Sequence, residues 1–191
     1  MSKSRFEAFT DAIIAIVMTV LVLNLDLPKD SSFSALLALK NQFLIYFVSF
    51  FILAIYWNNH HQLVHVVKKI DGVVLWANNI FILSLTLFPF ATSWVSSYPH
   101  DLTPQIAYAI VLLIADTCFF FLCLALMRTN SSKSKQTISF FKNKTLITMV
   151  IIIISIILGI FTHPELIIII NSICLLPWIL PYKKKHTTSS R

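Results

Sequence analysis

The sequence predicts an all-helical (all-α) integral membrane protein with six transmembrane helices, and three observations support that prediction. First, 57% of the residues are hydrophobic and 12% are charged, whereas a soluble domain has roughly half apolar and a quarter charged residues. Second, apolar stretches recur along the chain, and most approach the roughly 20 residues that cross a bilayer core of about 30 Å. Third, the basic residues gather in alternate connections, as they do between helices that cross a membrane.

The six predicted segments are residues 5–25, about 43–57, 73–95, 105–127, 145–161 and 166–182. At the start of the first, Ser4 and Glu7 have the spacing of a capping box, which predicts a helix that begins near Arg5. The second is short unless it begins near Leu37, with Lys40 reaching toward the membrane surface. The fifth and sixth segments can also be interpreted as one hairpin that does not cross.

The first segment also has the basic start and apolar stretch of a secretory signal peptide. Asp11 interrupts its apolar part and no small-x-small cleavage site follows Leu25, so a transmembrane helix is the preferred interpretation. Pro89 and Pro177 are candidate kinks in the third and sixth segments. Residues 1–182 are expected to form one six-helix transmembrane domain, followed by a basic cytoplasmic tail at residues 183–191.

The basic residues predict the orientation of the chain in the membrane. If the N-terminus is cytoplasmic, 13 lysines and arginines lie inside and only Lys29 and Lys40 lie outside. The positive-inside rule therefore predicts that both termini are cytoplasmic. The net charge of +7 is spread over loops and a tail, which indicates contact with anionic lipid at the cytoplasmic face rather than nucleic-acid binding.

Motifs for catalysis and for tight ligand binding are absent from the sequence. The chain has no phosphate-cradling glycine loop, no nucleophile motif and no helical His-Glu zinc motif, so we expect neither an enzyme nor a cofactor. Its three cysteines, Cys118, Cys123 and Cys174, lie at membrane depth and are expected to be buried thiols. Gly72 and Gly159 are the only glycines, which excludes the glycine-bearing filter of the familiar potassium channels.

The opening segment has an apolar stripe and, apart from it, an aspartate. At 100° per residue, one face of the predicted helix carries Ala12, Ile16, Thr19, Val20, Leu23 and Leu27. Asp11 lies about 140° around the helix from Ile16. We therefore expect the carboxylate and the stripe to face different neighbours. From the helical wheel alone, ordinary packing or lipid contact is the more common role for such a stripe.

Polar residues of the second and third segments fall near the same depth as Asp11. The second segment ends in Tyr56-Trp57-Asn58-Asn59-His60-His61, and the third begins with Trp76, Asn78 and Asn79. A buried carboxylate is costly without donors, and indole, imidazole and amide groups all donate. We therefore predict a hydrogen-bond network of Asp11 with Trp57, His60 or Asn78. The alternatives are an interfacial aromatic belt, solvated loop histidines and separate polar helix contacts.

Several of these residues resemble the signature of a known family. Arg5, Phe9, Thr10 and Asp11 are similar to the Arg-x-x-x-Phe-Ser-Asp motif of the endosomal and lysosomal potassium channel family and its prokaryotic homologues, with threonine in place of serine. Further matches to that family are Tyr56-Trp57 with His60-His61, Trp76-x-Asn78 and Pro89-Phe90. The resemblance is specific over residues 5–90 and only topological beyond them.

The resemblance implies a potassium-permeable cation channel in a prokaryotic plasma membrane, with the first helices of four identical subunits lining the pore. By family position Ile16 corresponds to a hydrophobic constriction, with Thr19 or Val20 and then Leu23 as further layers. A ring of apolar side chains closes a pore by dewetting, because it offers an ion nothing to replace its hydration shell. Potassium would pass Ile16, Thr19 and Leu23 in transit, with no tightly bound metal. His60 and His61 are candidate pH sensors or structural donors.

Asp116, near the middle of the fourth segment, matches no family motif. Acids at membrane depth are functional candidates by default, and a proton-coupled secondary transporter that uses Asp116 and the histidines is the alternative function. The structural interpretation is an uncharged acid bonded to a hydroxyl or to an amide such as Asn171. A non-conducting membrane scaffold is a third hypothesis.

Overall fold

The computed structural model describes residues 2–179, apart from the side chains of Lys133 and Ile179, and every regular element within them is a helix. The elements are α1 (Lys3–Leu23), α2 (Phe33–Ala38), α3 (Lys40–His65), α4 (Gly72–Leu85), α5 (Phe88–Ser97), α6 (Leu102–Thr129), α7 (Ser132–Phe161), α8 (Leu166–Cys174) and the short 3-10 helix η1 (Leu176–Ile179). The predicted all-helical class is confirmed. The predicted tail at residues 183–191 lies outside the described residues.

Five helical stretches of the described chain are long and apolar enough to cross a membrane: α1, α3, α4 with α5, α6 and most of α7. The sixth predicted segment forms only the 9-residue α8 and the turn of η1, up to the last described residue. A straight helix of that length rises only about 14 Å, roughly half of the hydrocarbon core. Six crossings are therefore not confirmed.

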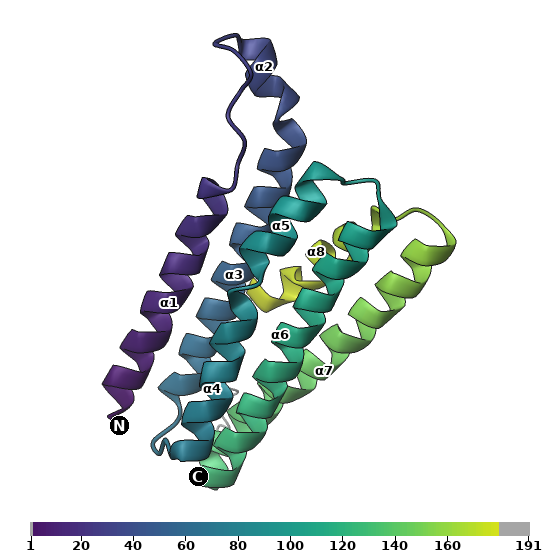
Figure 1. Ribbon diagram of the computed structural model, residues 1–191. Coiled ribbons are helices and arrows are strands. Elements are labelled where there is room, and N and C mark those ends of the chain that lie inside the picture. Colours follow the sequence, from purple (N-terminus) through teal and green to yellow (C-terminus); the bar gives the residue numbers. More distant parts are fainter. Residues whose placement is uncertain (1, 180–191) are drawn as a thin grey trace, which may run out of the picture.

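The helices form a bundle with α1 at one edge and α7 at the other (Figure 1). Helix α1 packs against α3, α4 and α5, whereas α6 packs against α4, α5, α7 and α8. The core between them is rich in aromatic side chains, among them the fully buried Phe81, Phe88, Tyr108 and Phe119. Figure 1 shows α8 passing behind α6 toward α3 at about mid-height of the bundle.

The structure corrects the predicted start of the first helix and locates the break near Pro89. Ser2 caps α1 by accepting a hydrogen bond from the Arg5 amide at 3.4 Å, so the helix begins at Lys3 and the predicted Ser4 capping box does not form. Between α4 and α5 the helix breaks at residues 86–87, just before Pro89 in the first turn of α5. Proline removes a backbone donor there, which accounts for the candidate kink.

Gly159 lets α7 approach α8 closely. A Cβ atom built at Gly159 would fall on the side chain of Ile167, which is fully buried in the first turn of α8. At Gly72 the same Cβ would meet no atom within 4 Å. The two glycines therefore form a matched pair, one in a tight helix contact and one in open space.

We expect Gly159→Ala to lower the free energy of unfolding by about 1–3 kcal/mol, the usual cost of overpacking, whereas Gly72→Ala should have little effect. In an Ile167→Ala background the Gly159→Ala effect should shrink, because the clashing atoms are gone. Thermal unfolding in detergent gives the stability of the two glycine variants, of Ile167→Ala and of the Gly159→Ala/Ile167→Ala double variant, each relative to the unmodified chain. Equal effects of Gly72→Ala and Gly159→Ala would contradict the close contact between α7 and α8.

Candidate functional site

The predicted apolar stripe of α1 faces away from the rest of the subunit. Ile16 is 61% exposed and Leu23 is 78% exposed, whereas Ile14 and Leu21 are buried against the bundle. Thr19 is also exposed, and Val20 is half-buried at the edge of the stripe. The outward side of α1 is therefore a mostly apolar surface that the rest of the described chain leaves uncovered.

The opposite side of α1 is attached to the bundle by a buried polar chain. The Asn78 amide Nδ2–H of α4 donates to Thr10 Oγ1 at 2.8 Å, and the Thr10 hydroxyl donates to the Phe6 carbonyl at 3.1 Å. His60 of α3 bonds Asn78 Oδ1 through Nε2 at 2.8 Å. All three side chains are buried. Asn78 thus joins α1, α3 and α4 through both ends of its amide group.

The His60 ring is enclosed by two aromatic rings. Its centroid lies 6.0 Å from that of Phe6 and 5.9 Å from that of Phe81, and both pairs are stacked. A buried imidazole with a fixed hydrogen bond is better suited to a structural donor than to a sensor in contact with water. His61, by contrast, is exposed and stacks between Trp57 and His65 on the surface of α3.

Asp11 lies outside this buried chain. Its Oδ1 accepts a hydrogen bond from the Trp57 indole at 2.9 Å, and Trp57 is 41% exposed. Of the three predicted donors only Trp57 bonds Asp11, whereas Asn78 bonds Thr10 and His60 bonds Asn78. The reason is rotation about the helix: Thr10 points into the bundle, and the next residue is turned by 100° toward the surface.

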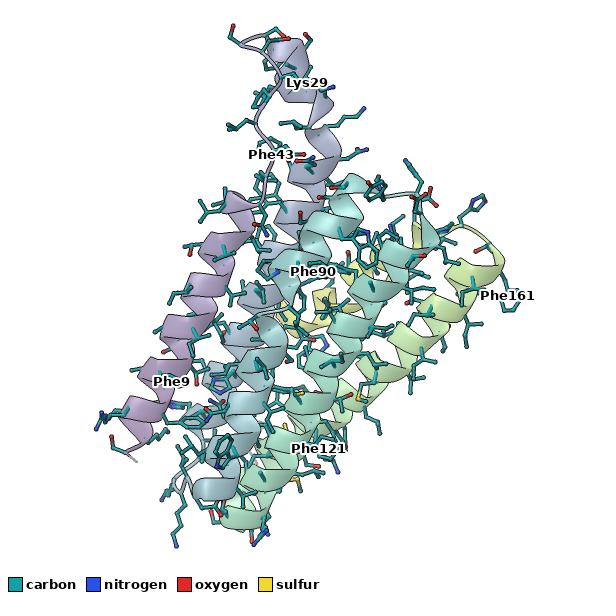
Figure 2. The ribbon with its side chains drawn as sticks, viewed as in Figure 1. Phe9, Lys29, Phe43, Phe90, Phe121 and Phe161 are labelled. Atoms are coloured by element: carbon teal, nitrogen blue, oxygen red, sulfur yellow. The ribbon has the colours of Figure 1, made fainter. Side chains whose placement is uncertain are left out.

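The remaining signature residues lie on the outward side of α1. Arg5 and Phe9 are both exposed, and at 100° per residue they fall within about 20° of Ile16. Figure 2 labels Phe9 near the N-terminal end of α1. The signature therefore has three orientations: Arg5 and Phe9 outward, Thr10 into the bundle, and Asp11 sideways to Trp57.

A groove of about 510 Å³ lies beside the stripe, between α1 and the break that separates α4 from α5. Ile16 and Val20 form one wall, and the polar residues along it are Asn24, Thr86 and Ser93. The Asn24 amide donates to the Pro89 carbonyl at 3.2 Å and ties the end of α1 to α5. Asn24 was not identified from the sequence, although a polar residue at the end of an apolar segment could have indicated it.

Asp116 has a hydroxyl partner in the core. Tyr56 of α3 donates its phenol proton to Asp116 Oδ1 at 2.7 Å. Asp116 is 1% exposed, and its Oδ2 has no hydrogen-bond partner among the described residues. The suggested partner Asn171 is wrong: its Oδ1 accepts instead from Ser155 of α7 at 3.2 Å. Asp116 therefore links α6 to α3 and does not bond α8.

Because Asn78 serves two buried partners, we expect Asn78→Leu to destabilise the fold far more than Asp11→Ala. The substitution leaves His60 Nε2 without a partner, at roughly 1–3 kcal/mol for an unsatisfied buried group, and it also removes the donor to Thr10 Oγ1. Asp11→Ala frees only the indole of a partly exposed tryptophan. Thermal unfolding and the yield of monodisperse protein in detergent compare the two. If Asp11→Ala proved as damaging as Asn78→Leu, the buried chain through Asn78 would not be the main attachment of α1.

At Asp116 we expect Asp116→Asn to preserve passive cation flux, because the amide oxygen still accepts the Tyr56 hydrogen bond. Tyr56→Phe should be the more destabilising change, by roughly 1–3 kcal/mol, since it leaves the buried carboxyl without a donor. Flux into liposomes and thermal unfolding are the measurements. Loss of all flux in a well-folded Asp116→Asn protein would instead support the proton-coupled transporter.

Comparisons with known proteins agree on one family. The sequence model of the family described as "Endosomal/lysosomal potassium channel TMEM175" matches residues 5–89, which contain most of α1, all of α3 and α4, and the whole Thr10–Asn78–His60 chain. A potassium channel of Chryseobacterium sp. (strain P1-3) is 35% identical over 186 residues, covering 96% of each chain. The mouse endosomal/lysosomal proton channel TMEM175 is 34% identical over 136 residues, covering 63% of this chain and 27% of its own.

A solved structure shares the fold. The crystal structure of a lysosomal potassium-selective channel TMEM175 homolog from Chamaesiphon minutus aligns with a TM-score of 0.69 at 24% identity, over 92% of this chain and 97% of that one. The family consists of ion channels, so the expectation that the chain is not an enzyme is confirmed. On its similarity to the Chryseobacterium channel over nearly the whole length of both chains, this protein belongs to the TMEM175 channel family.

Proposed function

We propose that four copies of this chain form a potassium-permeable channel whose pore is lined by the outward side of α1. This proposal rests on one observation. The apolar stripe predicted for the pore, which includes Ile16 and Leu23, faces away from the subunit. Four such stripes around an axis form stacked apolar rings. Ile16 and Leu23 are seven residues apart, so their rings are about 10 Å apart along the helix.

Beside the stripe, α1 carries small residues that would let the α1 helices of neighbouring subunits approach closely. Ala8, Ala12 and Ala15 are exposed beside Ile16 and fall on one side of it at 100° per residue. Small residues let membrane helices approach closely, because lipid provides no hydrophobic driving force for their association. Four α1 helices with such a flank are able to surround a narrow pore.

Thr19 adds an oxygen to this lining. Its hydroxyl proton is donated to the Ile16 carbonyl at 2.7 Å, which leaves the lone pairs of Thr19 Oγ1 free to face a cation. The neighbouring Ile16 and Leu23 rings are wholly apolar, and a narrow apolar ring dewets and blocks ions until it widens. In this arrangement potassium passes Thr19 between two apolar layers without a tight binding site.

The orientation and location follow from the same proposal. Both termini face the cytoplasm, where lysines and arginines gather beside anionic lipid. The bacterial source of the Chryseobacterium relative supports a prokaryotic plasma membrane. The Asn78 chain, the Asp11–Trp57 bond and the Asn24–Pro89 bond hold the inner side of α1, so that the stripe keeps its direction.

We expect Ile16→Asn to raise resting cation flux and to reduce the discrimination between potassium and sodium, because a polar ring lowers the cost of wetting the pore. Leu23→Asn should act similarly. Liposomes that contain the purified variants and a fluorescent cation reporter provide the measurement.

Ile14→Val and Leu21→Ala are the controls, since both residues are buried on the inner side of α1. They should lower stability, by about 0.5–1.5 and 2–5 kcal/mol respectively, with little change in selectivity. Unchanged flux and selectivity in well-folded Ile16→Asn and Leu23→Asn proteins would remove α1 from the pore.

A further inference from the structure

A second groove, of about 550 Å³, runs along α3 and is closed on one side by the end of α8 and by η1. Its walls are almost wholly apolar, with Leu44, Phe47 and Phe51 from α3 and Leu175 and Leu176 from the C-terminal segment. Beside the groove α8 ends at Cys174 and is followed by the turn of η1.

The dimensions of the groove suit one hydrocarbon chain. From Leu44 to Asn58 its lining extends over 15 residues of α3, which is about 21 Å of helix. One leaflet accounts for half of a hydrocarbon core of about 30 Å, so the groove is longer than a leaflet is deep. The hydroxyl of Ser172, one of its few polar groups, is already bonded to the Ile168 carbonyl at 2.6 Å.

A cation stands at the outer end of the groove. Lys40 is exposed and begins α3, one turn before Leu44. Lys40, Leu44, Phe47 and Phe51 follow one another at spacings of four, three and four residues, which places them on one side of the helix. Lys40 is also one of the two basic residues, with Lys29, that the positive-inside rule places on the outer face. A phosphate above the groove would therefore find its charge partner there.

The groove also faces away from α1. Trp57, which bonds Asp11 of α1, lies about 120° around α3 from Phe51 at 100° per residue. Phe51 is 61% exposed, so the groove opens toward the surroundings of the bundle. The residues after 179 carry three consecutive lysines and do not match its apolar walls.

We propose that this groove binds one glycerophospholipid of the outer leaflet, with its phosphate beside Lys40 and one acyl chain between α3 and the α8–η1 segment. The bound chain fills the apolar space between α3 and the α8–η1 segment. It thereby stabilises the docking of α8, whose other contacts are with α6 and α7. This proposal does not depend on the pore, because no residue of the groove belongs to α1.

The test uses the full chain in vesicles of phosphatidylethanolamine and phosphatidylglycerol that contain a trace of phosphatidylglycerol with a diazirine near the end of one acyl chain. After illumination, mass spectrometry of the peptides locates the label. We expect it to concentrate on the peptides that contain Phe51 and Leu176. Lys40→Gln should weaken this labelling by roughly fivefold, the size expected for one lysine beside anionic lipid, and Ala54→Phe should abolish it by filling the groove.

Matched controls are Lys29→Gln, the other predicted outer cation, and Ile114→Phe on the exposed side of α6, at a depth similar to that of Phe51. Both should leave the labelling unchanged. Equal labelling of the Phe51 and Ile114 peptides would mean ordinary bilayer contact and would overturn the proposal. Disulfide-linked dimers of Phe51→Cys would assign the groove to a second copy and would also overturn it. The unmodified chain already gives the labelling pattern, so a misfolded Ala54→Phe does not weaken the test.

Discussion

The amide of Asn78 is the point at which three helices of this protein are joined. It donates to Thr10 on α1 and accepts from His60 on α3, while its own backbone belongs to α4. Within a bilayer, packing of apolar side chains gives helices little preference for one another over lipid, so hydrogen bonds and close contacts decide which helices meet. An asparagine with both ends of its amide used sets the rotation of α1 as well as its position. The direction of the outward stripe depends on that rotation.

The two sides of α1 therefore have separate tasks. The inner side carries the buried residues Phe6, Ile14 and Leu21, and the outer side leaves Ile16 and Leu23 uncovered. The helix is apolar on both sides, so hydrophobicity alone does not distinguish them. What distinguishes them is the buried Asn78 amide, which needs an acceptor and finds Thr10 Oγ1 on the inner side. In the proposed channel, the bundle supplies the rigidity and the exposed side supplies the conduction path.

The C-terminal segment follows a different principle. Gly159 permits α7 to come close to Ile167, and the Ser155–Asn171 hydrogen bond joins the same two helices one turn away. These contacts hold α8 behind α6 (Figure 1). Beside the end of α8, Phe47 and Phe51 of α3 stay exposed and line the groove. The lipid proposed for the α3–α8 groove would cover them.

The sequence alone determined the membrane class, the positions of the first five apolar segments and the family resemblance, since these follow from composition, apolar length and a local motif. It also determined that Thr10, Asp11 and Ile16 point in different directions, because the angle between helical residues is fixed. It did not determine which direction faces the bundle, and for that reason the network was assigned to Asp11 rather than to Thr10. Likewise the apolar residues 166–182 indicated a sixth crossing, whereas within the described residues α8 ends at Cys174 and passes into η1. Only the tertiary structure decides such points, because a helix has a fixed angular pattern whereas its rotation and depth depend on its neighbours.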